Sequence, residues 1–353
     1  MARIGVNALY LIPGGVGGTE IYLRELLSAL ALIDSTNEYF VFTNLETGAD
    51  LVPKAPNFSW KPQAVRASFR PARILWEQTI LALEASRYRL DVLFNPGFTA
   101  PLLASCRMVS VFHDLQHKRH PEYFRRFDLL FWRFLLWASA HRSEKLIAVS
   151  HFTRADLVKF YRIPKEKITV IPHGVDRRFF ELDRSRIEPF VLCVSTLHPH
   201  KNIECLVRVY ARKQREYRLV LAGMRGFHTE PIEALIRELE ISGRVELTGW
   251  LPRDELLGLY TRARAFVYPS TFEGFGMPVL ESMAAGIPLA CSDIPPLREL
   301  AEGCAVFFDP LNEDSLEAAL EQVVSGFDAG PGQKRARQYT WEQTARLALN
   351  ALL

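Results

Sequence analysis

Long apolar runs are missing from this chain of 353 residues, and none reaches the roughly 18 consecutive residues that a membrane-spanning helix needs. The first residues, MARIGVNAL, also lack the features of a secretory signal peptide, because a single arginine is followed at once by glycine and a strand-like alternation. The sequence therefore predicts a cytoplasmic protein that does not span a membrane.

Cysteine is scarce and follows no pattern. The set is odd in number and contains no CxxC pair: Cys106, Cys193, Cys205, Cys291 and Cys304. Such a set argues against a disulfide framework and against a zinc site, and it fits a reducing compartment. Low-complexity tracts and fixed-period repeats are also absent, which argues against fibrous and solenoid architectures.

Net charge is small, since 43 basic side chains face 40 acidic ones, but it is unevenly distributed. Residues 1–172 hold 22 basic and 15 acidic side chains, a net of +7, while residues 173–353 hold 21 and 25, a net of −4. A basic half predicts an anionic partner for that half. Since no nucleic-acid-binding motif occurs, we expect phospholipid headgroups or a lipid-linked phosphate as that partner and no nucleic acid.

Strands and helices alternate along both halves of the chain, which predicts an α/β protein with parallel sheets. Strands are expected at residues 3–9, 39–44, 91–97, 107–114 and 145–150, and after a hinge near 173–188 again at 189–196, 217–223, 244–249 and 265–270. Helices are expected between them, for example at 21–33, 151–161 and 202–214. Sheets of this kind bind ligands at the carboxyl ends of their strands.

The segment PSTFEGFGMPVLESMAAGIP (269–288) carries the clearest chemical signal. A strand ends at Tyr268, a glycine-containing loop follows, and Pro278 suits the first turn of the next helix. Free amides at a helix start attract phosphate, and Glu273 and Glu281 can accept hydrogen bonds from sugar hydroxyls. The pattern fits a sugar nucleotide, although an ordinary helix with a glycine-softened entry and solvated glutamates would have the same residues.

The segment EGFGMPVLE resembles the Glu–seven residues–Glu signature of retaining glycosyltransferases of the GT-B fold, in the large fourth family, also called group 1. Other segments match that family in order over nearly the whole chain: GGVGGTE (14–20), WEQTIL (76–81), VFHDLQHKRHPEYF (111–124), LIAVSHFTRADL (146–157), VIPHGVD (170–176), STLHPHKN (195–202), LVLAGMRGFH (219–228), VELTGWLP (245–252) and LYTRARAFVYPSTF (259–272).

The resemblance implies two doubly wound, Rossmann-like parallel-sheet domains that face each other across a cleft. We expect an acceptor-binding domain at residues 1–172, a donor-binding domain at 173–339, and a C-terminal helix at 340–353 that crosses back to the first domain. In the donor domain, the resemblance assigns Glu281 to the ribose hydroxyls and Glu273 to the transferred sugar. It assigns the sugar and diphosphate to a backbone stretch made of Phe275, Gly276, Met277, Pro278 and Val279.

Lys201 follows a strand in HPHKN, and the resemblance implies that it neutralises charge on the departing diphosphate. Many family members carry an arginine five positions earlier, where this chain has Thr196, and the branch reading roughly TLEPRKN has an arginine where His200 stands. The second cation then comes from elsewhere. Arg225 is the best candidate for it, although Arg225 could equally be a solvated loop residue.

In the first half, His113 closes what reads as the fourth strand, and the resemblance places it near the donor sugar. The resemblance also places Gly17 and Gly18 beside the diphosphate. Glu20 stands where a dinucleotide fingerprint needs its third glycine, which argues against NAD. His113, His117 and His120 have a spacing that suggests a metal site, but they read as a loop, and enzymes of this fold generally need no catalytic metal.

FRRFDLLFWRFLLW (124–137) mixes aromatic residues with arginines, a composition found in helices that lie on anionic membranes. The alternative is a core helix with solvated arginines. We accordingly expect a cytoplasmic enzyme with possible peripheral contact on the inner face of the membrane.

The resemblance thus implies a retaining hexosyltransferase without metal or cofactor. It would transfer a hexose from a nucleoside diphosphate sugar to a hydroxyl of a saccharide or lipid-linked acceptor in bacterial polysaccharide synthesis. The TLxPxKN and WEQ segments resemble those of mannosyl and related transferases that build bacterial polysaccharides, which implies mannose from GDP-mannose. UDP-glucose and UDP-N-acetylglucosamine stay open, as does an inactive homologue that only binds nucleotide sugar. An NAD-dependent oxidoreductase is disfavoured, because the glycine fingerprint is incomplete and no Tyr–Lys pair lies on one helix.

Overall fold

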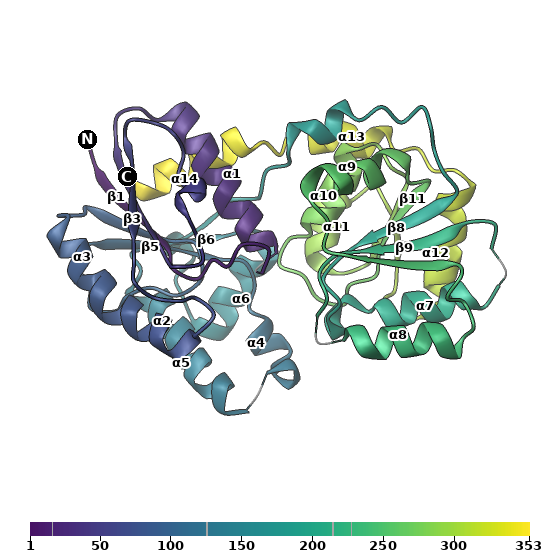
Figure 1. Ribbon diagram of the computed structural model, residues 1–353, viewed down its shortest axis with the longest axis horizontal. Helices are drawn as coiled ribbons and strands as arrows, with labels where there is room; N and C mark the ends of the chain where they lie inside the picture. Colours follow the sequence, from purple (N-terminus) through teal and green to yellow (C-terminus); the bar gives the residue numbers. More distant parts are fainter. Residues whose placement is uncertain (16, 125, 214, 227) are drawn as a thin grey trace. The chain divides into compact units, whose positions relative to one another are not determined.

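The computed structural model describes residues 1–15, 17–124, 126–213, 215–226 and 228–353 (Figure 1). Val16, Arg125, Gln214 and Phe227 fall within segments singled out above and lie outside the described residues. The chain divides into two compact units, the first made of Met1–Gly174 with Trp341–Leu353 and the second of Val175–Thr340. The first unit thus ends at Gly174, where the sequence analysis placed the boundary at 172.

Unit 1 is built on a seven-stranded parallel sheet in the order β3-β2-β1-β4-β5-β6-β7. Its strands are β1 (Arg3–Ala8), β2 (Glu38–Thr43), β3 (Phe58–Pro62), β4 (Val92–Asn95), β5 (Arg107–Phe112), β6 (Lys145–Ala148) and β7 (Ile168–Val170). The central strand β1 is buried from Ile4 to Ala8, as expected for a parallel strand that is covered on both faces.

The sequence analysis missed β3, the strand at one edge of this sheet. Its side chains alternate between buried and exposed, and a proline ends it, so it lacks the apolar run that marks the central strands. As a consequence, the strand that His113 follows is the fifth along the chain and not the fourth.

Helices cover both faces of this sheet (Figure 1). They are α1 (Gly18–Ile33), α2 (Arg70–Trp76), the π turn η2 (Glu77–Leu81), α3 (Ala82–Arg87), α4 (Gln116–Arg119), α5 (Arg126–Arg142), α6 (His151–Tyr161) and α14 (Trp341–Leu352). The C-terminal α14 packs against α1, and Thr344 donates a hydrogen bond to the carbonyl of Pro172 at 2.9 Å. Helix α5 extends beyond residue 137, the expected end of its segment.

Unit 2 is built on a six-stranded parallel sheet in the order β10-β9-β8-β11-β12-β13. Its strands are β8 (Phe190–Val194), β9 (Arg218–Ala222), β10 (Val245–Gly249), β11 (Ala265–Tyr268), β12 (Leu289–Ser292) and β13 (Val306–Phe308). Its helices are α7 (Ile203–Ala211), α8 (Thr229–Glu238), α9 (Arg253–Arg262), α10 (Met277–Ala284), α11 (Pro295–Ala301), α12 (Glu313–Ser325) and α13 (Gly330–Ala336). The short strands β12 and β13 were not among the expected ones.

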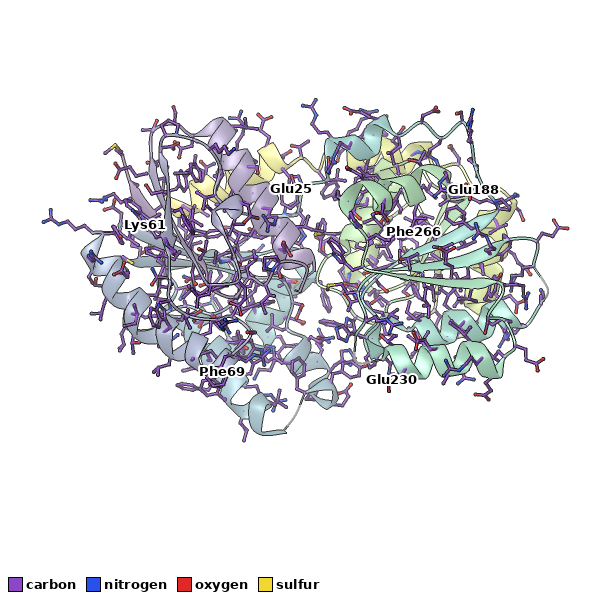
Figure 2. All side chains as sticks on the ribbon, in the orientation of Figure 1. Glu25, Lys61, Phe69, Glu188, Glu230 and Phe266 are labelled. Carbon is purple, nitrogen blue, oxygen red and sulfur yellow. The ribbon has the colours of Figure 1, made fainter. Side chains whose placement is uncertain are left out.

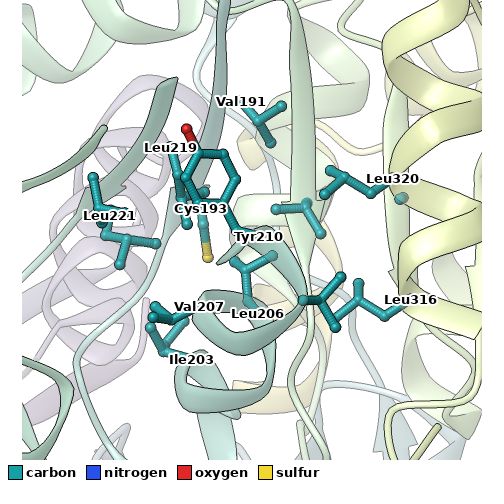
Figure 3. Packing of buried hydrophobic residues seen from close by; sticks show 14 of the residues in the cluster. Val191, Cys193, Ile203, Leu206, Val207, Tyr210, Leu219, Leu221, Leu316 and Leu320 are labelled. Carbon is teal, nitrogen blue, oxygen red and sulfur yellow. The ribbon is translucent and has the colours of Figure 1, made fainter. Parts of the chain in front are cut away.

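The core of unit 2 lies between its sheet and the helices α7 and α12 (Figure 3). Val191 and Leu219 of the sheet meet Leu206 of α7 and Leu320 of α12, and all four side chains are fully buried. Each such side chain contributes about 1.5–3 kcal/mol to folding. Side chains fill the interior in the same way at β11, where Phe266 is buried (Figure 2).

The two sheets and their covering helices confirm the predicted α/β fold with two doubly wound units. Among the described residues, no helix combines the length and the apolar character that crossing a bilayer requires.

Candidate active site

The loop between β11 and α10 begins the candidate site at the carboxyl end of the unit 2 sheet. Gly276 caps α10 with φ of +104°, and a Cβ atom there would lie 2.4 Å from the Cδ2 atom of Leu297. Only glycine avoids both problems, since other residues are disfavoured at positive φ and the clash leaves no room. Pro278 lies in the first turn of the helix. Gly276 and Pro278 therefore fix the backbone at the N-terminus of α10, which was predicted to bind phosphate.

Lys201 and Glu273 form an ion pair beside this loop, with 2.5 Å between Nζ and Oε1. The hydroxyl of Tyr268, at the end of β11, donates to the same Oε1 at 2.7 Å and accepts from Lys201 Nζ at 3.0 Å. The side chains of Lys201 and Glu273 are 15% and 12% exposed, so both are largely buried. The sequence analysis singled out the lysine and the glutamate but missed the tyrosine between them.

Burial opposes ionisation of Glu273, but the nearby charges of Lys201 and His200 outweigh burial and lower the pKa of its carboxyl group. Glu273 is therefore an anion at neutral pH. The main chain fixes this arrangement, because the carbonyl of His200 accepts hydrogen bonds from the Thr271 amide at 2.8 Å and from the Ser270 hydroxyl at 3.1 Å.

Glu281 lies in α10, one helix turn after Met277, and belongs to a second polar cluster. Its Oε1 accepts from Arg253 at 2.9 Å, and its Oε2 accepts from the hydroxyl of Tyr260 at 3.0 Å. Arg253 also lies 3.5 Å from the carboxylate of Asp176. Each oxygen of a carboxylate can accept more than one hydrogen bond, so Glu281 keeps capacity for a ligand hydroxyl.

Arg253 was not singled out from the sequence, although one signal for it was available. It begins α9 directly after the loop that follows β10, which is at the carboxyl end of a parallel strand. Burial lowers the pKa of its guanidinium group, but Glu281 and then Asp176 raise it further, so the net shift is upward. Arg253 is thus a fixed cation whose position is set by two carboxylates.

The remaining donor residues are distributed around these two clusters. Phe275 is buried directly before Gly276, and Met277 begins α10 half-buried. The amide of Val279 donates to the Gly276 carbonyl at 3.0 Å, which commits it to the helix. Thr196 is half-buried in the loop after β8, two residues before His198.

Arg225 forms an ion pair outside the two polar clusters. Its side chain is 73% exposed and pairs with Glu233 at 2.7 Å. Within the described residues, no contact joins it to Lys201 or Glu273, so its role as the second cation stays a prediction. His198 is another basic residue near Lys201. Burial first, and then the charges of Lys201 and His228, lower the pKa of its ring, which disfavours the cationic form.

His113 follows β5 at the carboxyl end of the unit 1 sheet and is 7% exposed. Its Nε2 lies 2.9 Å from the carbonyl of Pro96. Because a carbonyl can only accept, Nε2 carries the ring proton and Nδ1 presents a lone pair. Burial lowers the pKa of His113 to about 4, so the ring is neutral at physiological pH. The rings of Tyr22 and His173 lie 5.0 and 5.5 Å from it, and neither residue was predicted as a neighbour.

The glycine loop of unit 1 leads directly into α1. Gly17 caps this helix and Gly18 is its first residue. The carboxylate of Glu20 accepts from the Gly14 amide at 2.8 Å, and the hydroxyl of Tyr10 donates to the Thr19 carbonyl at 3.3 Å. Both glycines therefore lie at a helix N-terminus, the position where backbone amides favour an anion.

The other two histidines of the suspected metal spacing have protein partners. His117 Nε2 lies 2.6 Å from the hydroxyl of Tyr161, and His120 Nδ1 lies 2.9 Å from Glu122. Across the described parts of the chain, no three histidine, cysteine, aspartate or glutamate residues are placed to hold a metal ion together.

Two family profiles match the chain. The profile of glycosyl transferases group 1 matches residues 175–340, and that of glycosyltransferase family 4 matches residues 16–179. Together they span residues 16–340.

Two curated mannosyltransferases match over most of their length. O-antigen chain mannosyltransferase B from Escherichia coli is 26% identical, and the match covers 95% of both chains. O-antigen chain mannosyltransferase RfbU from Salmonella typhimurium is 28% identical, with 85% of this chain and 83% of the relative covered.

Solved structures show the same fold at lower identity. Sucrose-phosphate synthase from Thermosynechococcus elongatus has a TM-score of 0.81 at 20% identity, covering 99% of this chain and 98% of the other. HepE from Anabaena, in complex with UDP and glucose, has a TM-score of 0.77 at 17% identity, covering 100% and 99%.

Proposed function

The chain belongs to the group 1 glycosyl transferases of family 4, and from that premise we propose that it transfers mannose from GDP-mannose to a hydroxyl of a saccharide or lipid-linked acceptor, with retention of configuration. The predicted GT-B fold and the predicted family are confirmed, and the chain is a glycosyltransferase. Mannose is favoured because the relatives named above are mannosyltransferases of O-antigen synthesis.

The observation that carries the proposal is the ion pair between Lys201 and Glu273, next to the start of α10 at the carboxyl ends of the strands. In this proposal the backbone around Phe275, Gly276 and Met277 holds the sugar and the diphosphate. The carboxylate of Glu281, held by Arg253 and Tyr260, accepts from the ribose hydroxyls. The donor is thereby bound at both ends.

Transfer then requires charge stabilisation at the leaving group. The bond between the sugar C1 atom and the diphosphate oxygen breaks, and negative charge grows on that oxygen. In this proposal Lys201 stabilises this charge, and such stabilisation is stronger in the transition state than in the ground state. The bond from the acceptor oxygen to C1 forms on the same face, and the acceptor proton passes to the leaving phosphate.

Glu273 and His113 have orienting tasks in this scheme. Glu273 accepts hydrogen bonds from sugar hydroxyls, while Lys201 keeps it ionised. The neutral ring of His113 offers Nδ1 as an acceptor to a further sugar hydroxyl. In this proposal the lysine and the backbone amides supply the positive charge at the diphosphate, so the scheme needs no metal and no organic cofactor.

A peripheral contact with an anionic membrane completes the proposal. Leu130, Phe131, Phe134 and Trp137 of α5 are between 44% and 69% exposed. Their spacing places them along one face of the helix, while Leu135 and Leu136 point into the core. An exposed apolar stripe on a unit with excess positive charge suits a bilayer surface on the cytoplasmic side.

A donor panel tests the proposed transfer. Purified protein is incubated with chelator and with GDP-mannose, UDP-glucose or UDP-N-acetylglucosamine, together with polyprenyl-diphosphate-linked saccharides, and the released nucleotide is measured. We expect GDP to be released and mannose to appear on the acceptor. Release of UDP alone would assign another donor, and no turnover of any donor would favour an inactive homologue that binds nucleotide sugar.

A further inference from the structure

Glu77, the first residue of the π turn η2, carries an almost fully buried carboxylate, with 1% of the side chain exposed. Its Oε2 accepts from the Thr99 hydroxyl at 2.9 Å and from the Asn7 amide group at 3.3 Å, and Arg73 lies 3.7 Å away. A buried charge is retained only where partners stabilise it. Turns of the π type are rare within α-helices and occur often at functional sites.

Gln78, the next residue of the π turn, contacts the loop that contains Thr99. Gln78 donates from Nε2 to the Ala100 carbonyl at 2.9 Å, and its Oε1 accepts from the Leu102 amide at 2.9 Å. From α5, the hydroxyl of Ser139 accepts from the Ala100 amide at 3.0 Å. The loop that follows β4, residues 96–102, is therefore held by side chains of η2 and α5. We call it the β4 loop.

The β4 loop has a strained backbone. Phe98 adopts φ of +71°, which bulky residues rarely do. Such a conformation persists only where the surroundings determine it, and it is found often at active sites. The adjacent Gly97 is packed so closely that a Cβ atom would lie 2.2 Å from the ring of Tyr10. The hydrogen bonds from η2 supply the constraint that this conformation needs.

The β4 loop supplies the hydrogen-bond acceptor that determines which ring nitrogen of His113 carries the proton. The carbonyl of Pro96 accepts the hydrogen bond from His113 Nε2, and the ring of Phe98 meets the imidazole edge-on with 5.3 Å between the centroids. A shift of the loop would remove the acceptor for Nε2–H. The proton could then move to Nδ1, which would no longer offer a lone pair.

We propose that Glu77 and Gln78 are positioning residues: they hold the β4 loop in the strained conformation that fixes the ring and the tautomer of His113. Neither side chain needs to touch the substrates. The consequence for catalysis rests on the proposed function, in which Nδ1 of His113 accepts from the donor sugar. The tautomer, in contrast, is a property of the free protein and can be measured without any substrate.

Thr99→Val is the sharpest test, because it removes the hydroxyl bonded to Glu77 and nearly preserves the shape. Glu77→Gln is less suitable, since it would leave Arg73 buried beside a neutral group and the protein could fail to fold. Thr99→Ser keeps the hydroxyl and serves as the conservative rescue. Thr79→Val is the matched control, because Thr79 lies in the same π turn but donates to the Leu75 carbonyl at the surface.

Nitrogen-15 NMR of histidine-labelled protein without ligand reports the tautomer, with His113→Gln used to assign the signal. We expect the Nε2–H form in wild type, in Thr99→Ser and in Thr79→Val, and a mixed population in Thr99→Val. With GDP-mannose, we expect kcat of Thr99→Val to fall about 10-fold while KM for the donor changes little.

An unchanged tautomer in folded Thr99→Val would overturn the inference, and so would equal loss of kcat in Thr79→Val. A changed tautomer in Thr99→Val, together with a wild type that turns over no donor, would support the positioning role and contradict the proposed function. The two failures are thus distinguishable.

Discussion

Two side chains, Lys201 and Glu273, carry the proposed chemistry, and their pairing explains how each performs its task. The carboxylate holds the ammonium group in place at 2.5 Å, and the ammonium group lowers the pKa of the carboxylate against the effect of burial. Glu273 therefore stays ionised at neutral pH, as the proposed transfer requires. Tyr268 holds both with its hydroxyl group and stays protonated, because burial and Glu273 raise its pKa well above the usual value.

The first prediction concerns Lys201→Ala. Removing a group that stabilises charge in the transition state lowers kcat by roughly 100-fold or more. We expect that loss in donor turnover in a variant that still folds, as circular dichroism checks, with some loss of thermal stability because Glu273 is left without its cation. Lys213→Ala is the matched control, because Lys213 makes surface ion pairs with Glu317 and Glu321. Undiminished turnover in Lys201→Ala would remove the lysine from the mechanism.

The second prediction concerns Glu281→Ala and nucleotide binding. Loss of a charged hydrogen-bond acceptor for ribose costs about 1.5–3 kcal/mol, which corresponds to a Kd roughly 10- to 100-fold higher. Isothermal titration calorimetry with GDP measures this change. Glu238→Ala, at the exposed end of α8, should bind as wild type does. Equal affinity in both variants would show that ribose is bound elsewhere.

The third prediction concerns pH and two buried histidines. Burial lowers the pKa of His113 and of His117 to about 4, whereas both titrate near about 6.5 in the unfolded chain. Between those values the unfolded chain binds more protons, so the free energy of unfolding falls as the pH drops from about 6.5 towards 4. Each histidine contributes about 1.4 kcal/mol per pH unit in that range.

Urea unfolding near pH 7 and near pH 5 measures this slope. We expect lower stability near pH 5, and a smaller loss in His117→Gln than in wild type. His120→Gln is the control, since His120 is partly exposed beside Glu122. A wild-type stability that is the same at both pH values would contradict the assignment of neutral, buried histidines.

At the scale of single elements, helix α5 shows how one segment satisfies both readings of its sequence. Leu135 and Leu136 are buried, as a core helix requires, while Phe131 and Phe134 are more than half exposed. The content of arginine and aromatic residues could not distinguish a membrane-surface helix from a core helix, because the distinction depends on which residues face the sheet. The structure assigns a buried face and an exposed apolar face to the same helix.

The fourth prediction is that the exposed face of α5 binds anionic membranes. Sedimentation with phosphatidylglycerol-containing liposomes at low salt should carry wild type into the pellet, and added salt should weaken binding. Phe131→Ser combined with Phe134→Ser should stay in the supernatant. Leu311→Ser removes an even more exposed apolar side chain from unit 2 and should bind as wild type does. Absence of wild-type binding at low salt would contradict the membrane contact.

The strands and helices with clear periodic patterns were predictable, and the exceptions have physical reasons. Central strands such as β1 and β8 are apolar runs because both faces are covered, whereas β3 alternates and β13 has only three residues. In the candidate site, Lys201, Glu273 and Glu281 were recognisable by motif. Their partners were not, because Arg253 and Tyr260 reach Glu281 from a different helix, and only folding brings them together.

At the scale of the whole molecule, the two units differ in charge and in the chemistry that they present. The basic first half contains the apolar face of α5 and the neutral ring of His113. The acidic second half contains both polar clusters, the one with Lys201 and Glu273 and the one with Glu281. The expectation that unit 1 receives the acceptor and unit 2 holds the donor stays a prediction. The family profiles also divide the chain near the boundary between the units.

Titration calorimetry of the whole protein with GDP and with UDP, in buffer containing a metal chelator, tests the central claim most directly. The account predicts tight binding of GDP and weak binding of UDP without metal, with GDP affinity reduced in Glu281→Ala. Tight binding of UDP alone would contradict GDP-mannose as the donor. Binding of neither nucleotide by folded protein would contradict the donor site itself.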